Sequence, residues 1–180
     1  MASKQENNNG AVSELRRDLV TGNWVVVAKG RGDRPQVKKF GDEEHDAISK
    51  CPLEDPKKSG NAEPVLMYKN KGEWSLQVIP NKYPAFAGGV CDVVRKVGPY
   101  SVQDGRGFHE VIITRDHYKH LALLGTAQVE EILRAYEERY SALKGVDCVK
   151  YISIFHNHRK EAGASLTHPH SQLIAIPIIP

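Results

Sequence analysis

The sequence has few cysteines and no long apolar segment, and these shortages limit the classes of protein to which it can belong. None of its apolar runs approaches the roughly 18 residues that a membrane-spanning helix needs. The first residues, MASKQENNNGAVSE, lack the apolar core of a signal peptide, so we interpret residues 1–14 as a disordered leader. The three cysteines, Cys51, Cys91 and Cys148, are widely spaced and odd in number, which argues against a disulfide framework. Because this usage favours a reducing compartment, we expect a cytoplasmic protein.

An excess of charge of one sign is also missing. The formal net charge is +3 over 180 residues, and the basic residues are interleaved with acidic ones. This distribution disfavours nucleic acid as a partner, whereas a small anionic ligand such as a nucleotide is compatible with it. The length and the 40% hydrophobic composition are ordinary for one globular domain, which we place at residues 15–180.

The hydrophobic pattern predicts an α+β fold. Apolar residues recur at spacings of three and four between Thr126 and Gly145, which predicts a helix with Thr126 as its N-cap and Lys144-Gly145 at its end. Strands are predicted within residues 19–29, 64–68, 74–79, 108–114, 149–155 and 171–176. Residues 36–64 show no sustained period and are expected to form a long ordered loop. This order of elements indicates a mostly antiparallel sheet covered on one face by one long helix.

Histidine is the unusual component, since four of the eight histidines lie between His156 and His170. Pro169 keeps its surroundings extended, so the side chains of His168 and His170 are expected to share a face. A neutral imidazole is a good nucleophile toward phosphorus and a good zinc ligand, so this pair can serve either role. The alternative is that these are loop histidines at the entrance of a strand.

Five motifs, in order along the chain, resemble the galactose-1-phosphate uridylyltransferase family, a branch of the histidine-triad superfamily. The most specific is His168-Pro169-His170-Ser171-Gln172, which is similar to the family signature His-Pro-His-x-Gln. Asn157, Gly163 and Ser165 precede it at the family's spacing, and the other motifs are residues 17–25, 31–35, 80–84 and 107–113. The resemblance covers residues 15–177 and implies a histidine-triad-like fold.

The resemblance also implies a reaction, the ping-pong transfer of UMP between UDP-glucose and a hexose 1-phosphate. His170 would be the nucleophile and form a uridylyl-histidine, while its other ring nitrogen donates to the backbone carbonyl of His168. Gln172 would donate to a phosphate oxygen as charge develops there, with Ser165 and the Gly163 backbone lining the same pocket.

Further phosphate or nucleotide contacts are implied for Asn81 and Asn157. Arg31 and Arg34 match family arginines that approach the phosphates across a dimer interface, so a homodimer is implied as well. Arginine suits this role because its guanidinium donates to phosphate in a bidentate manner. A solvated basic turn is the alternative interpretation of this arginine pair.

The metal site is where the sequence departs from the family. Relatives bind zinc through a Cys-x-x-Cys pair, a histidine of an Asp-His element and the first histidine of His-Pro-His. The corresponding residues here are Cys51, Glu54 in place of the second cysteine, His117 and His168. One thiolate, one carboxylate and two imidazoles form an acceptable zinc set, so we predict a structural site. The alternative is loss of the metal, with Cys51 packed and Glu54 exposed.

Three classes of function remain open. Uridylyl transfer to a hexose 1-phosphate leads, followed by an ADP-sugar phosphorylase or nucleotide hydrolase of the same superfamily, and then by a noncatalytic nucleotide-binding half-domain. The family usually has a second, similar half, so we expect this chain to correspond to the N-terminal one. His45, His109 and His120 are interpreted as structural or surface residues, and no role is assigned to His156 or His158.

Overall fold

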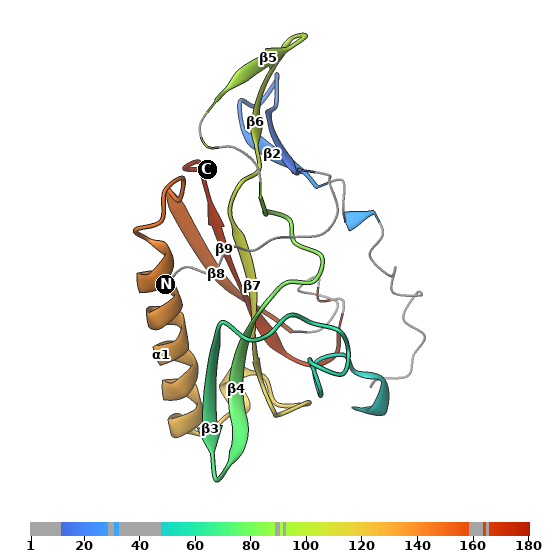
Figure 1. Ribbon diagram of the computed structural model, residues 1–180, viewed down its shortest axis with the longest axis vertical. Helices are drawn as coiled ribbons and strands as arrows, with labels where there is room; N and C mark the ends of the chain where they lie inside the picture. The colour runs from blue at the N-terminus through green and yellow to red at the C-terminus, as the bar shows by residue number, and fades with distance from the viewer. Residues whose placement is uncertain are drawn as a thin grey trace.

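The computed structural model describes residues 12–28, 31–32, 48–88, 91, 93–158, 164 and 166–180. Within these ranges the chain forms one long helix and two antiparallel sheets, one above the other in Figure 1. The α+β class with a mostly antiparallel sheet, predicted from the order of elements, is confirmed. No helix among the described residues is long and apolar enough to cross a membrane.

The larger sheet has five strands in the order β3-β4-β7-β9-β8, and every neighbouring pair is antiparallel. Its strands are β3 (Leu66–Asn70), β4 (Glu73–Pro80), β7 (Phe108–Thr114), β8 (Tyr151–Asn157) and β9 (His170–Ile176). All five were predicted, and the bounds of β7 agree at both ends. The two central strands, β7 and β9, are almost entirely buried, because side chains cover them on both faces.

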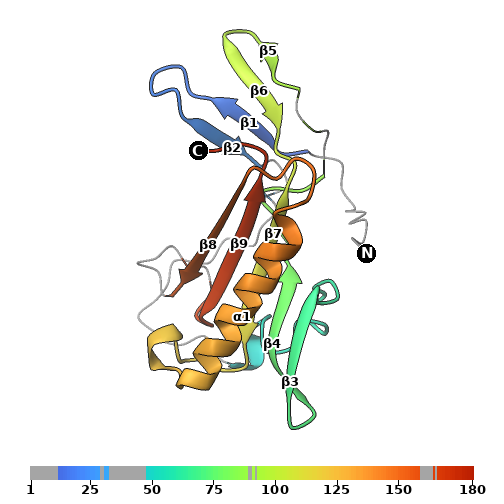
Figure 2. The same cartoon turned by 90° about the vertical axis from the view of Figure 1, so that its left-hand side faces the viewer.

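Helix α1 (Thr126–Leu143) covers one face of this sheet, as Figure 2 shows from the helix side. Its buried residues Ile132, Ala135 and Leu143 pack with Leu76, Val78, Ile112, Leu173 and Ala175 of the strands. The predicted cap was wrong by one residue, because Gly125 is the N-cap and Thr126 already belongs to the helix. Gly125 instead donates its backbone N–H to the Gln128 side chain at 3.3 Å.

The smaller sheet has the order β2-β1-β6-β5 and lies beyond one end of the larger sheet. Its strands are β1 (Glu14–Arg17), β2 (Trp24–Val27), β5 (Arg95–Val97) and β6 (Tyr100–Asp104). Of these four strands only β2 was predicted, as part of the longer run at residues 19–29. A core of Leu15, Phe86 and Ile176 joins this sheet to the end of β9.

The described part of the predicted loop, residues 48–64, contains only the short 3-10 helix η2 (Ile48–Lys50) and turns. It lies against the face of the large sheet that α1 leaves open. There Leu53, 5% exposed, packs on Ile79, Val111 and Ile113, and Cys51 joins the edge of the same cluster. The loop is thus held by apolar contacts that its own composition does not reveal.

The cysteine pattern, which argued against a disulfide framework, did not reveal a single disulfide. Cys91 and Cys148 form a disulfide with their Cα atoms 5.7 Å apart, a separation that is usual for this bond. The two cysteines are 57 residues apart in sequence, and only the fold brings them together. The pairing removes the cysteine argument for a reducing compartment.

Candidate functional site

The face of the large sheet opposite α1 carries the side chains that the histidine motif predicts to be functional. Successive side chains of a strand point to opposite faces, and Leu173 and Ala175 of β9 pack under the helix. His170 and Gln172 therefore lie on the open face. Asn157, at the end of β8, pairs with His170 across the two strands. The antiparallel register thus brings Asn157 to the motif from a separate strand.

His170 is held in one ring orientation. Its Nδ1 lies 2.9 Å from the backbone oxygen of His168, and the residue is 6% exposed. A carbonyl oxygen can only accept, so Nδ1 carries the proton and donates it. In the neutral ring Nε2 is then the nitrogen with a lone pair. This is the contact, and the tautomer, that the resemblance implies for a nucleophilic histidine.

Gln172 lies in a hydrogen-bond network that includes a residue not predicted to be functional. His109 on β7 places its Nε2 2.7 Å from Gln172 Oε1, and its Nδ1 accepts the Ala85 N–H at 3.0 Å. His109 is 6% exposed, so its assignment as a structural or surface residue overlooked a place beside the predicted site. Strand alternation could have indicated that His109 lies near the motif, because His109 and Val111 share one face of β7 and Val111 pairs with Gln172.

Asn81 and Arg31 meet at the loop that follows β4. The side-chain oxygen of Asn81 accepts the Tyr83 N–H at 2.9 Å, and its amide nitrogen lies 3.1 Å from His109 Nε2. Arg31 donates from Nη1 to the Tyr83 carbonyl at 3.0 Å. Asn81 is thus connected to Gln172 of the histidine motif through His109, and Arg31 contacts the same loop at Tyr83. Arg34, Gly163 and Ser165 lie outside the described residues.

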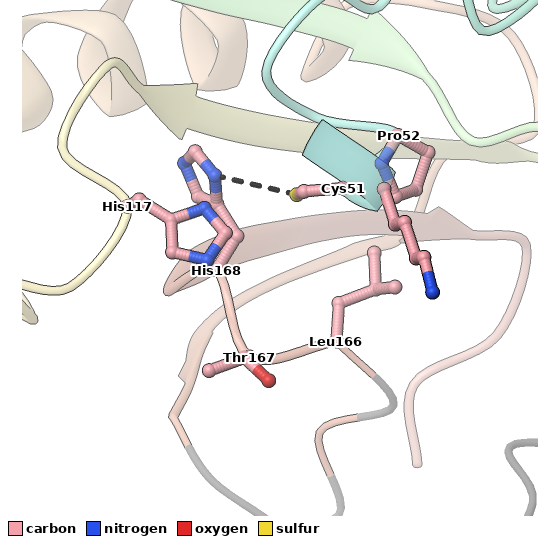
Figure 3. Close-up of a pocket in the computed structure, with 7 residues that line it drawn as sticks. Cys51, Pro52, His117, Leu166, Thr167 and His168 are labelled. Carbon is pink, nitrogen blue, oxygen red and sulfur yellow. Dashed lines mark hydrogen bonds between the residues drawn. The ribbon is translucent and has the colours of Figure 1, made fainter. Parts of the chain in front are cut away.

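The four predicted metal ligands come together beside this face. One ligand atom from each of Cys51, Glu54, His117 and His168 lies within 4.8 Å of every other. Glu54 Oε1 is 2.6 Å from His117 Nδ1 and 3.1 Å from His168 Nδ1, and Cys51 Sγ is 3.7 Å from His168 Nδ1. Figure 3 shows Cys51 and the two imidazoles directed toward one another. The expectation of an exposed Glu54, which accompanied the alternative of metal loss, is wrong, because its side chain is 28% exposed and contacts both histidines.

The His168 ring has the tautomer that a metal ligand requires. It is fully buried, and its Nε2 lies 2.8 Å from the Thr114 carbonyl oxygen, to which it donates. Burial lowers the pKa of His168, although the Thr114 contact and the Glu54 charge oppose this change. In the neutral ring that this burial favours, the Nδ1 lone pair faces the Glu54 carboxylate. A cation between these two acceptors would relieve their repulsion, so the four residues fit a metal ion.

A cavity of about 170 Å³ opens beside this cluster. Its wall contains three of the four candidate ligands, Cys51, His117 and His168, and the picture in Figure 3 is centred on it. The remaining lining residues are Lys50, Pro52, Leu166 and Thr167. Through this opening a metal ion can reach a ligand set that is otherwise buried.

The other described histidines near the motif lie on the helix side of the sheet or at its edge. His156 Nδ1 is 2.9 Å from the Ser171 hydroxyl, which also contacts Tyr136 of α1. Burial lowers the pKa of His156, with a smaller contribution from His158 and His120. His120 caps η3 (Leu121–Leu123) by accepting the Ala122 N–H, which agrees with a structural role. His45 lies outside the described residues.

Known proteins resemble this chain over most of its length. Residues 2–180 match the family model described as galactose-1-phosphate uridyl transferase, N-terminal domain. An ADP-glucose phosphorylase from Arabidopsis thaliana is 31% identical over 93% of this chain and 49% of its own length. A galactose-1-phosphate uridylyltransferase from Thermotoga maritima is 33% identical over 93% of this chain and 48% of its own length.

Solved structures give the same result. The Arabidopsis thaliana ADP-glucose phosphorylase with bound ADP-glucose superposes with a TM-score of 0.61 at 30% identity, covering 93% of this chain and 50% of that one. A structure described as uridylyltransferase superposes with a TM-score of 0.62 at 26% identity, covering 93% and 47%. The chain thus spans about half the length of the relatives it matches.

Proposed function

Because the chain belongs to the galactose-1-phosphate uridyl transferase family, we propose that it transfers a nucleotidyl group from a nucleotide sugar through a covalent intermediate on His170. The observation that carries this proposal is the contact between His170 Nδ1 and the His168 carbonyl. It leaves Nε2 with the lone pair on the open face of the sheet, and it stabilises the positive charge that the ring acquires when Nε2 forms a bond.

The reaction has two steps. In the first, His170 Nε2 attacks the α-phosphorus of the donor, a P–N bond forms, and the bond to the bridging oxygen breaks to release a sugar 1-phosphate. In the second, an oxygen of the acceptor phosphate attacks the same phosphorus and expels the imidazole, which restores the neutral ring. A hexose 1-phosphate as acceptor gives a new nucleotide sugar. The scheme predicts ping-pong kinetics, because the first product leaves before the acceptor binds.

Hydrogen-bond donors around His170 would stabilise the phosphoryl oxygens as their charge grows. Gln172 is two residues from His170 on one face of β9, and Asn157 of β8 pairs with His170. Asn81 lies in the loop after β4, and Arg31, which follows β2, contacts this loop at the Tyr83 carbonyl. We propose the same function for Arg34, Ser165 and the Gly163 backbone on the basis of the family motif alone.

The nucleotide base remains to be assigned between two candidates. Uridylyl transfer to a hexose 1-phosphate follows from the family model and from the Thermotoga maritima relative. Adenylyl transfer has a specific observation in its favour, since the Arabidopsis thaliana relative is named ADP-glucose phosphorylase and its structure contains ADP-glucose. In a phosphorylase the acceptor is inorganic phosphate, and His170 would serve as the nucleophile in both reactions, carrying a uridylyl group in one and an adenylyl group in the other.

Zinc is the proposed occupant of the cluster of Cys51, Glu54, His117 and His168. Bound there, it would supply structural cross-linking and no step of the reaction. The cluster ties the loop at Cys51 and Glu54 to the ends of β7 and β9. His168 also offers its backbone carbonyl to His170, so a rigid His168 keeps the nucleophile in its tautomer. We further propose a homodimer, in keeping with the family motif around Arg31.

Intact-protein mass measured at neutral pH tests this function, because the P–N bond of a nucleotidyl-histidine is labile in acid. The protein is incubated separately with UDP-glucose, ADP-glucose and UTP, beside the variants His170→Asn and His120→Asn. We expect one nucleotidyl adduct in the wild type and in His120→Asn, and none in His170→Asn. The donor that gives the adduct assigns the base.

Other outcomes separate the remaining functions. Release of free nucleotide without a sugar 1-phosphate acceptor would indicate a hydrolase. Nucleotide binding without an adduct from any donor would contradict the proposal and indicate a noncatalytic nucleotide-binding half-domain.

A further inference from the structure

His109 connects the loop after β4 to Gln172 by hydrogen bonds at both ring nitrogens. Nδ1 lies 3.0 Å from the Ala85 backbone nitrogen, and Nε2 lies 2.7 Å from Gln172 Oε1. We infer that His109 is a positioning residue for the proposed nucleotidyl transfer. It fixes the side-chain amide of Gln172 so that the NH₂ group of the amide, and not its oxygen, is available to the phosphate.

The backbone N–H of Ala85 decides the tautomer of His109. An amide N–H can only donate, so Nδ1 must accept and is unprotonated. In a neutral ring the proton is then on Nε2, which donates to the nearest acceptor, Gln172 Oε1. The opposite tautomer would place two donors against each other at 3.0 Å and leave the Ala85 N–H without this acceptor.

The same reasoning fixes which end of the Gln172 amide faces His109. If the amide were rotated by half a turn, its NH₂ would meet the Nε2 proton, and two donors would again be opposed. Asn81 does not offer an alternative acceptor, because its oxygen accepts the Tyr83 N–H. Its NH₂ nitrogen, 3.1 Å from Nε2, is itself a donor and makes no hydrogen bond to the protonated ring nitrogen, so Gln172 Oε1 is the acceptor for Nε2. The oxygen of Gln172 is thus held by His109, and its NH₂ is directed elsewhere.

The direction of the Gln172 NH₂ group matters because of where Gln172 lies on its strand. Gln172 and His170 are two residues apart on β9 and share the open face, so the Gln172 amide lies on the same face as the proposed nucleophile. The Ala85 N–H, the imidazole and the Gln172 amide form a chain in which each member donates to the next. Such chains polarise in one direction, which strengthens the last donor. This inference rests on the proposed function, in which that donor meets the phosphoryl oxygen.

Two substitutions at position 109 separate the two hydrogen bonds of the ring. Asparagine places its oxygen near the position of Nδ1 and can still accept the Ala85 N–H, but it does not reach Gln172. Glutamine places its NH₂ near the position of Nε2 and can still donate to Gln172 Oε1. We expect His109→Asn to slow formation of the His170 adduct by about 10- to 100-fold in single-turnover measurements, since an oriented donor is weakened. We expect His109→Gln to recover most of the rate.

A merely structural role is excluded by two further readouts. Nucleotide affinity should change much less than the rate of adduct formation, so that the loss is in the chemical step. In a Gln172→Ala background His109→Asn should cause no additional loss, because His109 acts through Gln172. An equal loss in both backgrounds, or a wild-type rate in His109→Asn, would overturn the inference.

The tautomer can be measured in the wild-type protein without any turnover. Long-range ¹H–¹⁵N spectra of the histidine rings should show Nε2 of His109 protonated and Nδ1 unprotonated. Protonation of Nδ1 would overturn the inference. If no donor gives an adduct in the wild type, the proposed function fails, while these spectra still decide whether His109 holds Gln172 as described.

Discussion

Replacement of Glu54 by alanine should abolish stabilisation by zinc. Glu54 Oε1 lies 2.6 Å from a ring nitrogen of His117 and 3.1 Å from a ring nitrogen of His168, so it contacts two of the other three ligands. Without the Glu54 carboxylate, one thiolate and two imidazoles remain, and the metal site loses one negative charge. Zinc sites of this kind usually need four protein ligands to be closed and structural.

The size of the effect follows from linkage. A ligand present at 100 times its dissociation constant stabilises the folded state by about 2.7 kcal/mol. For a domain of this length one kcal/mol shifts the unfolding midpoint by about 2–4 °C, so zinc should raise the midpoint of the wild type by about 5–10 °C. In Glu54→Ala we expect a shift of less than about 2 °C under the same conditions.

Thermal unfolding in a zinc-buffered solution, after treatment with a chelator, measures both shifts. Glu63→Ala is the matched control, since the Glu63 carboxylate is 76% exposed and pairs only with exposed Lys57 in the described structure. Glu54→Cys, which restores a second thiolate, should raise the zinc-induced shift above that of the wild type. An absent shift in the wild type, or an equal shift in wild type and Glu54→Ala, would refute the reasoning.

Three further predictions concern the scaffold. Arg139→Ala leaves the buried carboxylate of Glu110 unpaired and should lower the free energy of unfolding by about 3–5 kcal/mol, measured in urea; a loss near zero would contradict the buried ion pair. Leu173→Ala, at a fully buried position under α1, should cost about 2–5 kcal/mol in the same assay, whereas a loss typical of the surface would contradict this packing. Burial lowers the pKa of His156 below its usual 6.5, so the unfolded chain binds more protons; stability should be intact above pH 6.5 and fall as pH drops toward the folded pKa. Urea unfolding across pH should show a shallower fall in His156→Gln, and an unchanged slope would contradict the assignment.

Patterns within short stretches of sequence determined much of this protein. The apolar spacing between Thr126 and Gly145 identified α1, and the alternating or apolar runs identified all five strands of the large sheet. These elements are long and bury one or both faces, so their periodicity is strong. The family resemblance of the motif from His168 to Gln172 implied the proposed nucleophile and its carbonyl partner, and both lie in one extended segment.

Tertiary structure alone decided the features that join distant segments. Strands β1, β5 and β6 are short, and the exposed β5 has no buried face to mark it, so only pairing with neighbours defines it. The bond between Cys91 and Cys148 and the role of His109 depend on approaches across 57 and 63 residues. The metal cluster spans Cys51 to His168; family resemblance suggested its members, but the loop packing of Leu53 brings Cys51 and Glu54 to the histidines. Local patterns record burial and backbone preference, whereas register and long-range packing decide which side chains meet.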